Sequence, residues 1–175
     1  IIDPNQRLIR TIRDPYTRFK EDPVRMLRAI RFSASHNFVI ENIVWEAICN
    51  LSYTISNVSP ARLYEEIQKL FLFGFSKKVF HLFIKSGLLS ALFPDILRWI
   101  SLSRKNMSLI YNNLDYLDKL YKDGKVLSIE LFLTFFLGPF IEADALVKHK
   151  NNVPYKQALE NVCKDTLKNI CKTVT

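Results

Sequence analysis

Glycine is scarce in this sequence, with 4 residues in 175, whereas an average usage of about 7% would give roughly 12. Folds that cradle phosphate in glycine-rich loops, or that turn through many tight hairpins, need the positive φ angles that glycine adopts most readily. The scarcity argues against both kinds of fold and favours helices joined by short polar turns. We therefore expect an all-α fold.

Cysteine and histidine are also few, with three residues of each. Cys49, Cys163 and Cys171 show no C-x-x-C spacing and have no cluster of histidines near them. We interpret them as reduced thiols at apolar positions and expect no metal site.

Long apolar runs are absent. The best candidate, residues 129–141, is shorter than the roughly 18 residues that indicate a membrane span, and Gly138–Pro139 interrupts it. Nothing at the N-terminus resembles a signal peptide. Together with the isolated cysteines, these features predict a reducing, cytoplasmic setting.

Basic residues outnumber acidic ones, 25 Lys and Arg against 17 Asp and Glu, which gives a net charge of +8. A basic surface of this size suits a polyanionic partner, either a nucleic acid or an anionic membrane. A basic globular protein without such a partner explains the charge equally well.

Apolar periodicity and capping residues predict a series of helices. Their expected ranges are about 22–35, 41–51, 59–74, 76–85, 107–121 and 129–138, with a last helix from about 155. Residues 1–20 are expected to be extended or turn-rich, because Asp3-Pro4 and Asp14-Pro15 disfavour helix at the residues before proline. Alternation over residues 8–12 permits one short N-terminal strand, whose partner strands we expect upstream of this sequence.

Residues 18–32 concentrate charge at a regular spacing. Asp22, Arg25 and Arg28 follow one another at three-residue intervals, so on a helix they project from one side. A carboxylate beside a guanidinium combines an acceptor with planar donors and can read the edge of a base. An exposed capping aspartate with surface ion pairs, each contributing about 0.3–0.5 kcal/mol, explains the same spacing.

The string from Glu21 to Phe32 (EDPVRMLRAIRF) closely resembles the neck-helix motif of bacterial poly(A) polymerases and of the related CCA-adding tRNA nucleotidyltransferases. A second string, from Ser59 to Leu70 (SPARLYEEIQKL), resembles the second neck helix of that family. Ser86-Gly87-Leu88-Leu89 and Leu92-Phe93-Pro94 recur at the expected distance. The resemblance is strong over residues 3–97 and faint beyond them.

The resemblance implies that Asp22 and Arg25 act as a protein template that hydrogen-bonds the base of the incoming nucleotide. Arg28, one turn further along, would support the pocket or reach the triphosphate. Pocket support is implied for four further residues, Glu21, Arg62, Glu65 and Glu66. Structural ion pairs between helices are the alternative for Arg62, Glu65 and Glu66.

The residues that would carry catalysis are not in this sequence. Members of the family transfer a nucleotidyl group to an RNA 3′ hydroxyl with two metal ions, which a pair of head carboxylates holds beside a Gly-Ser motif. Neither Gly-Ser nor Asp-x-Asp occurs in residues 1–175. The resemblance thus implies that the catalytic head lies upstream, that Mg²⁺ and ATP serve the parent enzyme, and that residues 1–175 alone are inactive.

The same resemblance divides the chain into three parts. Residues 1–20 would be the remnant of the connection between head and neck, 21–100 the neck, and 101–175 part of a helical body, with the boundary in the linker-like stretch 101–106. Relatives usually have glycine near the positions of Arg7 and Arg13, so the geometry of this connection is expected to differ here.

Several basic residues have aromatic neighbours that are able to stack a base. The residues that we expect to hold the RNA backbone are Arg98, Arg104, Lys105, Lys164, Lys168 and Lys172. Trp99 and Tyr111 are the candidate stacking residues. A solvated basic face is the alternative for each of them.

Three functions remain open at this point. Poly(A) addition is favoured over CCA addition by Val24-Arg25-Met26, by Pro60-Ala61-Arg62 and by Leu92-Phe93-Pro94. A non-catalytic helical RNA-binding module is the alternative from a different class. We expect RNA 3′ ends and ATP as partners, no membrane, and a monomer.

Overall fold

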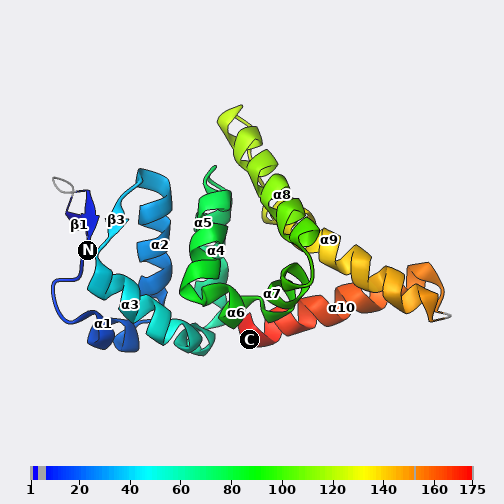
Figure 1. Cartoon of the computed structure of the whole chain (residues 1–175), viewed down its shortest axis with the longest axis horizontal. Helices are drawn as coiled ribbons and strands as arrows, with labels where there is room; N and C mark the ends of the chain where they lie inside the picture. Colours follow the sequence, from blue (N-terminus) through cyan, green and yellow to red (C-terminus); the bar gives the residue numbers. More distant parts are fainter. Residues whose placement is uncertain (1, 4–6, 152, 175) are drawn as a thin grey trace.

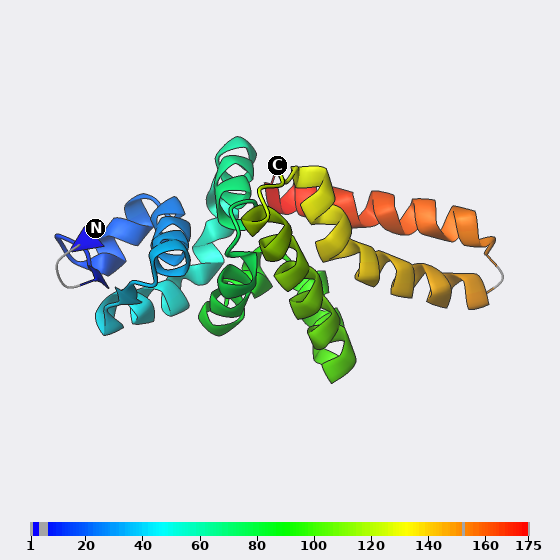
Figure 2. The same ribbon diagram turned by 90° about the horizontal axis from the view of Figure 1, so that it is seen from above.

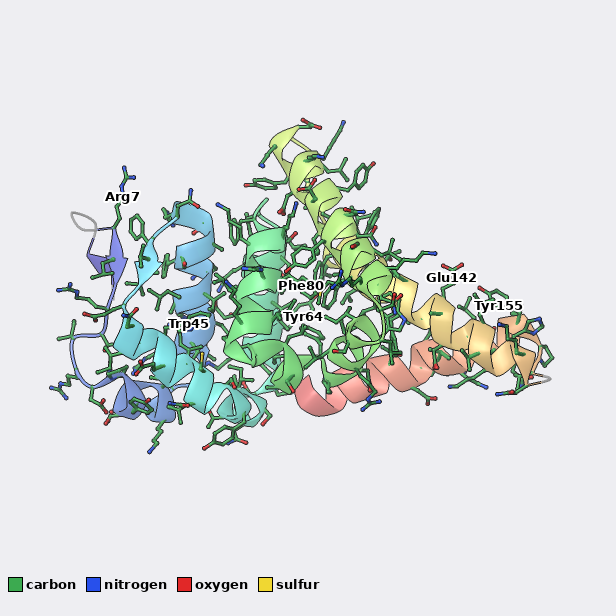
Figure 3. All side chains as sticks on the ribbon, in the orientation of Figure 1. Arg7, Trp45, Tyr64, Phe80, Glu142 and Tyr155 are labelled. Carbon is green, nitrogen blue, oxygen red and sulfur yellow. The ribbon has the colours of Figure 1, made fainter. Side chains whose placement is uncertain are left out.

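The computed structural model describes the backbone of residues 2–3, 7–151 and 153–174, and the side chains of residues 7–151 and 153–166. The molecule is elongated, with a small sheet at one end and a helical hairpin at the other (Figure 1). Figure 3 shows the span of the long axis, with Arg7 at the first end, Tyr155 at the second and Phe80 between them. Apart from the small sheet, the described residues are helical or lie in short connections, so the predicted all-α class is confirmed.

Three two-residue strands form the sheet: β1 (Ile2–Asp3), β2 (Leu8–Ile9) and β3 (Val39–Ile40). β2 lies in the middle, antiparallel to β1 and parallel to β3. The predicted strand is present, but the expectation that its partners lie upstream of the sequence was wrong. The partner β3 comes from about 30 residues further along, because Ile9 is buried beside Ile40 in the hydrophobic core, a pairing that local alternation does not reveal.

Helix α1 (Pro15–Glu21) was missed, since residues 1–20 were expected to be extended or turn-rich. Asp14 caps this helix, with its Oδ2 accepting hydrogen bonds from the backbone N–H of Thr17 at 2.8 Å and from the Thr17 hydroxyl at 2.7 Å. Pro15 occupies the first helical position, where proline has no partner to lose. Asp14-Pro15 therefore starts a helix and does not only end an extended segment.

Residues 24–101 form a series of short helices. They are α2 (Val24–His36), α3 (Asn42–Leu51), the 3-10 helix η1 (Ser52–Asn57), α4 (Pro60–Phe71), α5 (Ser76–Ser86), α6 (Leu88–Leu92) and α7 (Pro94–Ser101). Gly87 ends α5 with a φ of 81°, and a Cβ there would lie 3.0 Å from the Ser52 hydroxyl oxygen. Glycine is thus required at this turn by both conformation and space.

The remaining helices are α8 (Arg104–Lys122), α9 (Ile129–Lys150) and α10 (Tyr155–Val174). The helix predicted over residues 129–138 was placed correctly at its start but not at its end, because α9 continues through Pro139. A proline inside a helix leaves the carbonyl four residues earlier without its N–H donor. Here that carbonyl, on Phe135, accepts a hydrogen bond of 2.8 Å from the Asn113 side-chain amide of α8.

One hydrophobic core runs from Ile9 to Leu137 and includes residues on both sides of the 101–106 stretch. Stacked or edge-on phenylalanine rings form its centre, with Phe71, Phe132 and Phe136 in mutual contact. A buried carboxylate joins α8 to α5, since Asp118 accepts hydrogen bonds from the N–H groups of Ser76 at 2.7 Å and Lys77 at 3.1 Å. The three-part division of the chain stays a prediction.

Helices α9 and α10 form an antiparallel hairpin that extends away from this core (Figures 1 and 2). Among the side chains that the structure describes in this hairpin, Ala145, Ala158 and Val162 form a small buried cluster. The end of α10 returns to the middle of the molecule, where the helix also contacts α4.

Candidate functional site

The packing of α2 against α4 brings the two sequence motifs together. Asp22 contacts Arg62 near the start of both helices, and Arg28 contacts Glu66 about one turn further along. The residue numbers rise together on the two helices, so the helices run in the same direction. Residues some 40 positions apart in the chain thereby line one surface.

Asp22 occupies the corner between α1 and α2. Its N–H donates to the carbonyl of Arg18 at 3.3 Å, and its Oδ1 accepts from the N–H of Val24 at 3.3 Å. Arg62 Nη2 lies 3.0 Å from Oδ1 and 3.1 Å from Oδ2 of the same carboxylate. Because backbone and side chain are both held, the Asp22 carboxylate has a defined direction, and 19% of the side chain remains exposed.

Arg25 is tied to α1. Its Nη1 donates to the carbonyl of Arg18 at 3.1 Å and to Glu21 Oε2 at 3.2 Å. Its Nε lies 3.9 Å from Asp22 Oδ2, an ion-pair distance that is too long for a hydrogen bond. Glu21 also accepts from Arg18 at 2.6 Å, so one exposed carboxylate orients two guanidinium groups.

Glu66 is the buried centre of a second cluster, with a side chain only 4% exposed. Three cations surround it: Arg28 Nε at 3.4 Å, Arg31 Nε at 3.6 Å and Lys69 Nζ at 3.5 Å. Arg31 Nε and Glu66 Oε2 are buried and form no hydrogen bond. The cluster has an excess of positive charge, and Arg28 is its most accessible α2 member, with 41% of its side chain exposed.

The predicted support residues do not all lie in this interface. Glu21 contacts Arg25, Arg62 contacts Asp22, and Glu66 contacts Arg28. Glu65 is exposed and forms its ion pair with Lys69 on its own helix, at 3.9 Å. Arg31 belongs to the interface but was assigned no role, although its position three residues after Arg28 was a signal for it.

The predicted RNA-binding residues are dispersed. Arg98 forms an ion pair with Asp95 at 3.2 Å, and Arg104 and Lys105 are exposed at the start of α8. Lys164 is exposed on α10. The side chains of Lys168 and Lys172 lie outside the described residues.

The two candidate stacking residues differ in accessibility. Trp99 is buried, with 9% of its surface exposed, and its ring contacts Phe140 edge-on. It is therefore part of the core and offers little ring face to a base. Tyr111 is half-buried and lines an open cavity between α2, α5 and α8.

Cys49 and Cys163 are free thiols, and burial raises the pKa of Cys49. Among the residues that the structure describes, no three His, Cys, Asp or Glu side chains are grouped so as to hold a metal ion. No helix in the described part of the chain is both long and apolar enough to cross a membrane.

Comparison with known proteins gives one family-model match, to the family described as "Probable RNA and SrmB- binding site of polymerase A", over residues 37–100. The chain is 30% identical over 177 aligned residues to poly(A) polymerase I of Escherichia coli O6:H1, which covers 98% of this chain and 38% of that protein. It is also 30% identical to poly(A) polymerase I of Haemophilus influenzae, over 95% of this chain and 37% of the relative. The similarity therefore extends well beyond residue 97, where it was expected to become faint.

CCA-adding enzymes match a smaller part of the chain. The CCA-adding enzyme of Bacillus velezensis is 34% identical over 90 residues, which is 51% of this chain and 23% of that enzyme. The chain spans about 38% of the length of the poly(A) polymerase relatives that it matches.

Proposed function

Because this chain is a relative of the bacterial poly(A) polymerases over 98% of its length, we propose that it forms the nucleotide-selecting and RNA-binding part of a template-independent RNA nucleotidyltransferase. The parent enzyme would be a polynucleotide adenylyltransferase that adds AMP residues from ATP to RNA 3′ ends. The matched family description and the relatives' names support RNA as the partner.

The observation that carries nucleotide selection is the fixed Asp22 carboxylate beside the Arg25 guanidinium. An ionised carboxylate only accepts hydrogen bonds and a guanidinium only donates them. Adenine offers an amino donor next to a ring-nitrogen acceptor, which is the complementary pattern; cytosine offers the same pattern, whereas guanine and uracil offer the reverse. Asp22 would accept from the amino group while Arg25 donates to the ring.

Arg62 limits the freedom of Asp22, because its guanidinium bridges both carboxylate oxygens. Pre-organisation of this kind reduces the entropy lost when a ligand binds. Arg28, fixed by Glu66 through one nitrogen, keeps other N–H groups for a phosphate. In this proposal Glu66 and Arg62 position the selecting residues and do not touch the base.

The group transfer itself requires residues other than these. The metal ions and the Gly-Ser motif are assigned by resemblance to a catalytic head outside residues 1–175. A cytoplasmic location and a monomeric state are parts of the same proposal.

CCA addition is the second candidate, supported by the matches to CCA-adding enzymes over 51–55% of the chain. A non-catalytic RNA-binding module is the third, since the matched family description names binding alone. The longer alignment to poly(A) polymerase I, 98% of the chain, favours poly(A) addition.

Sequencing of reaction products tests this proposal. The full-length protein that contains this chain is incubated with Mg²⁺, ATP and CTP, once with a tRNA that lacks its terminal CCA and once with a generic RNA. We expect a homopolymeric A tail on the generic RNA. A CCA terminus confined to the tRNA would overturn poly(A) addition, and RNA binding without any added nucleotide would favour the binding module.

A further inference from the structure

A second open site lies about halfway along the molecule, between the end of α2, α5 and α8. It is a cavity of about 560 Å³ lined by, among others, Phe38, Lys77, Lys78, His81, Leu82 and Tyr111, and we name it the α5–α8 groove. Its volume is within the range of about 300–1,000 Å³ that small-molecule sites occupy. Apart from Tyr111, no residue proposed for nucleotide selection or RNA binding lines it.

The aromatic side of the groove is rigid. The Tyr111 ring packs edge-on against Phe80, with 5.2 Å between the ring centroids, and its hydroxyl lies 3.1 Å from His81 Nδ1. Across the groove from Tyr111, the loop after α2 is held by a hydrogen bond of 2.8 Å from the Ser33 hydroxyl to the carbonyl of Phe38. Two half-buried aromatic residues thus border one space, and both are fixed by their neighbours.

The charge of the groove is positive. Lys77 and Lys78 lie next to each other at the start of α5, and no described acidic residue lines the cavity. Lys77 Nζ contacts Asp115 at 2.9 Å, and the same carboxylate contacts Lys119 at 2.9 Å. Lys78 donates to the side-chain oxygen of Asn37, a neutral partner. Asp115 thus pairs with two lysines. Counting Lys77, Lys78 and Lys119 against Asp115 and the buried Asp118, which accepts from the Lys77 N–H, these residues carry one net positive charge.

From these features we propose that the α5–α8 groove holds one nucleotide of a single-stranded RNA, with its base against Tyr111 and Phe38 and its adjoining phosphates at Lys77 and Lys78. A positively charged groove with aromatic rings is the arrangement by which proteins bind single-stranded nucleic acid without reading its sequence. The inference rests on the proposed RNA-binding function and assigns it a second contact point. The groove would hold the RNA strand and not select the incoming nucleotide.

The groove differs from the other predicted RNA-binding residues in the accessibility of its aromatic ring. Trp99 is buried beside Arg98, whereas Tyr111 is open beside two lysines of another helix. Of the two candidate stacking residues, Tyr111 alone combines an accessible ring with adjacent cations. Stacking of a base on one aromatic ring accounts for a substantial part of single-strand affinity.

Binding of a short fluorescein-labelled oligoadenylate to the 175-residue chain, followed by fluorescence anisotropy, tests the inference. Tyr111→Ala is expected to weaken binding about tenfold, the effect of losing one stacking ring, whereas Tyr111→Phe keeps the ring and most of the affinity. Tyr116→Ala is the matched control, because Tyr116 is an exposed tyrosine of the same helix that stacks on Phe135 instead. Thermal unfolding of each variant shows whether the fold is retained.

The contribution of the cations has its own pair of variants. Lys78→Gln is expected to weaken binding and to lower the slope of log affinity against log salt, since a phosphate contact releases counterions. Lys85→Gln on the same helix, outside the groove, is the control. Photo-crosslinking of an RNA that contains 5-iodouridine is expected to modify Tyr111 or Phe38.

The outcomes separate the inference from the function on which it rests. If the chain binds the oligonucleotide but Tyr111→Ala and Lys78→Gln match their controls, or the crosslinks map only to other helices, the groove assignment is overturned and RNA binding stands. If the unmodified chain binds no RNA at any salt concentration, both the RNA-binding proposal and the groove assignment fail.

Discussion

The helix pairs α2–α4 and α9–α10 are held together in different ways. Between α2 and α4, the buried carboxylate of Glu66 has three cations within 3.6 Å, and Leu27 and Leu63 are part of the main core. Between α9 and α10, the buried apolar cluster among the described side chains is small, and the ion pair of Lys148 with Asp165, at 3.6 Å, is solvent-exposed. The packing of the first pair fixes the directions of its side chains, whereas the second pair forms an extended helical arm.

This difference indicates where positional accuracy is needed. In the proposed function, base selection by Asp22 and Arg25 would depend on hydrogen bonds, whose energy falls steeply with distance and angle, and the α2–α4 interface would supply the necessary accuracy. Contacts to an RNA backbone are electrostatic and tolerate movement. Lys164 on the α9–α10 arm would make contacts of this second kind.

Removal of the Glu66 charge is expected to have the largest effect on stability. Glu66→Gln leaves Arg28 and Arg31 without this counter-charge and Lys69 with only the exposed Glu65 at 3.9 Å, and the free energy of unfolding should fall by about 3 kcal/mol. That is the lower end of the range for breaking a buried ion pair, since all three cations keep some contact with water. Urea denaturation measures the change.

Glu65→Gln on the same helix is the control for this variant. Its side chain is 69% exposed, so its free energy of unfolding should change by less than about 0.5 kcal/mol. Equal losses for the two variants would show that the α2–α4 interface is not organised around Glu66.

The next largest effect on stability is expected from the hydrogen bond that joins Asn113 of α8 to the Phe135 carbonyl of α9. Asn113→Ala removes the donor to the Phe135 carbonyl and should cost about 1–2 kcal/mol, the usual effect of an unsatisfied buried acceptor. In a Pro139→Ala background the helix supplies its own N–H, so the same change should cost clearly less. A double-mutant cycle with no coupling energy would contradict the pairing of Asn113 with the proline site.

Hydrogen exchange compares the two helix pairs directly. Amides in residues 141–150 and 155–166 should exchange faster than those of α2 and α4, because the described side chains of this part of the arm form only a small buried cluster. Mass spectrometry of peptic fragments gives the rates. Equal protection in both helix pairs would remove the contrast between a fixed site and a loosely held arm.

How far the sequence predicted this molecule depends on the range of the contacts involved. Helices with periodic apolar residues and a local start or stop signal, such as Pro60 at the start of α4 and Gly87 at the end of α5, were predicted near their observed limits. The sequence did not predict the β2–β3 pairing or the continuation of α9 through Pro139, because each depends on a partner at least 22 residues away. Local sequence patterns do not reveal such distant partners.

The candidate site shows the same limit. The sequence placed Asp22, Arg25 and Arg28 on one helix side by spacing alone, and their roles stay predictions. It did not distinguish Glu65 from Glu66, which differ only in the direction that α4 gives them. Nor did it separate the buried Trp99 from the accessible Tyr111.

A small pH effect is expected at Asp115. Hydrogen bonds from Lys77 and Lys119 lower the pKa of this carboxyl from 3.8 to about 2. A lowered folded-state pKa means that the stabilisation is complete above pH 3.8 and is lost as the pH falls toward 2. Asp115→Asn should flatten the dependence of stability on pH in this window, measured by thermal unfolding, whereas the control Asp123→Asn should not. Identical profiles for the two variants would show that the contact of Asp115 with Lys77 and Lys119 is not the source of the pH dependence.

The most direct test of base selection by Asp22 and Arg25 is the nucleotide preference of Asp22→Ala in the full-length protein. Rates of incorporation of ATP, CTP and GTP into one RNA primer should become more alike, with the ATP preference reduced about tenfold, as expected for loss of a base-reading hydrogen-bond pair. Affinity for the primer should be unchanged. If Asp22→Ala keeps the original preference among the three nucleotides, Asp22 and Arg25 do not select the base and the proposed template role is wrong.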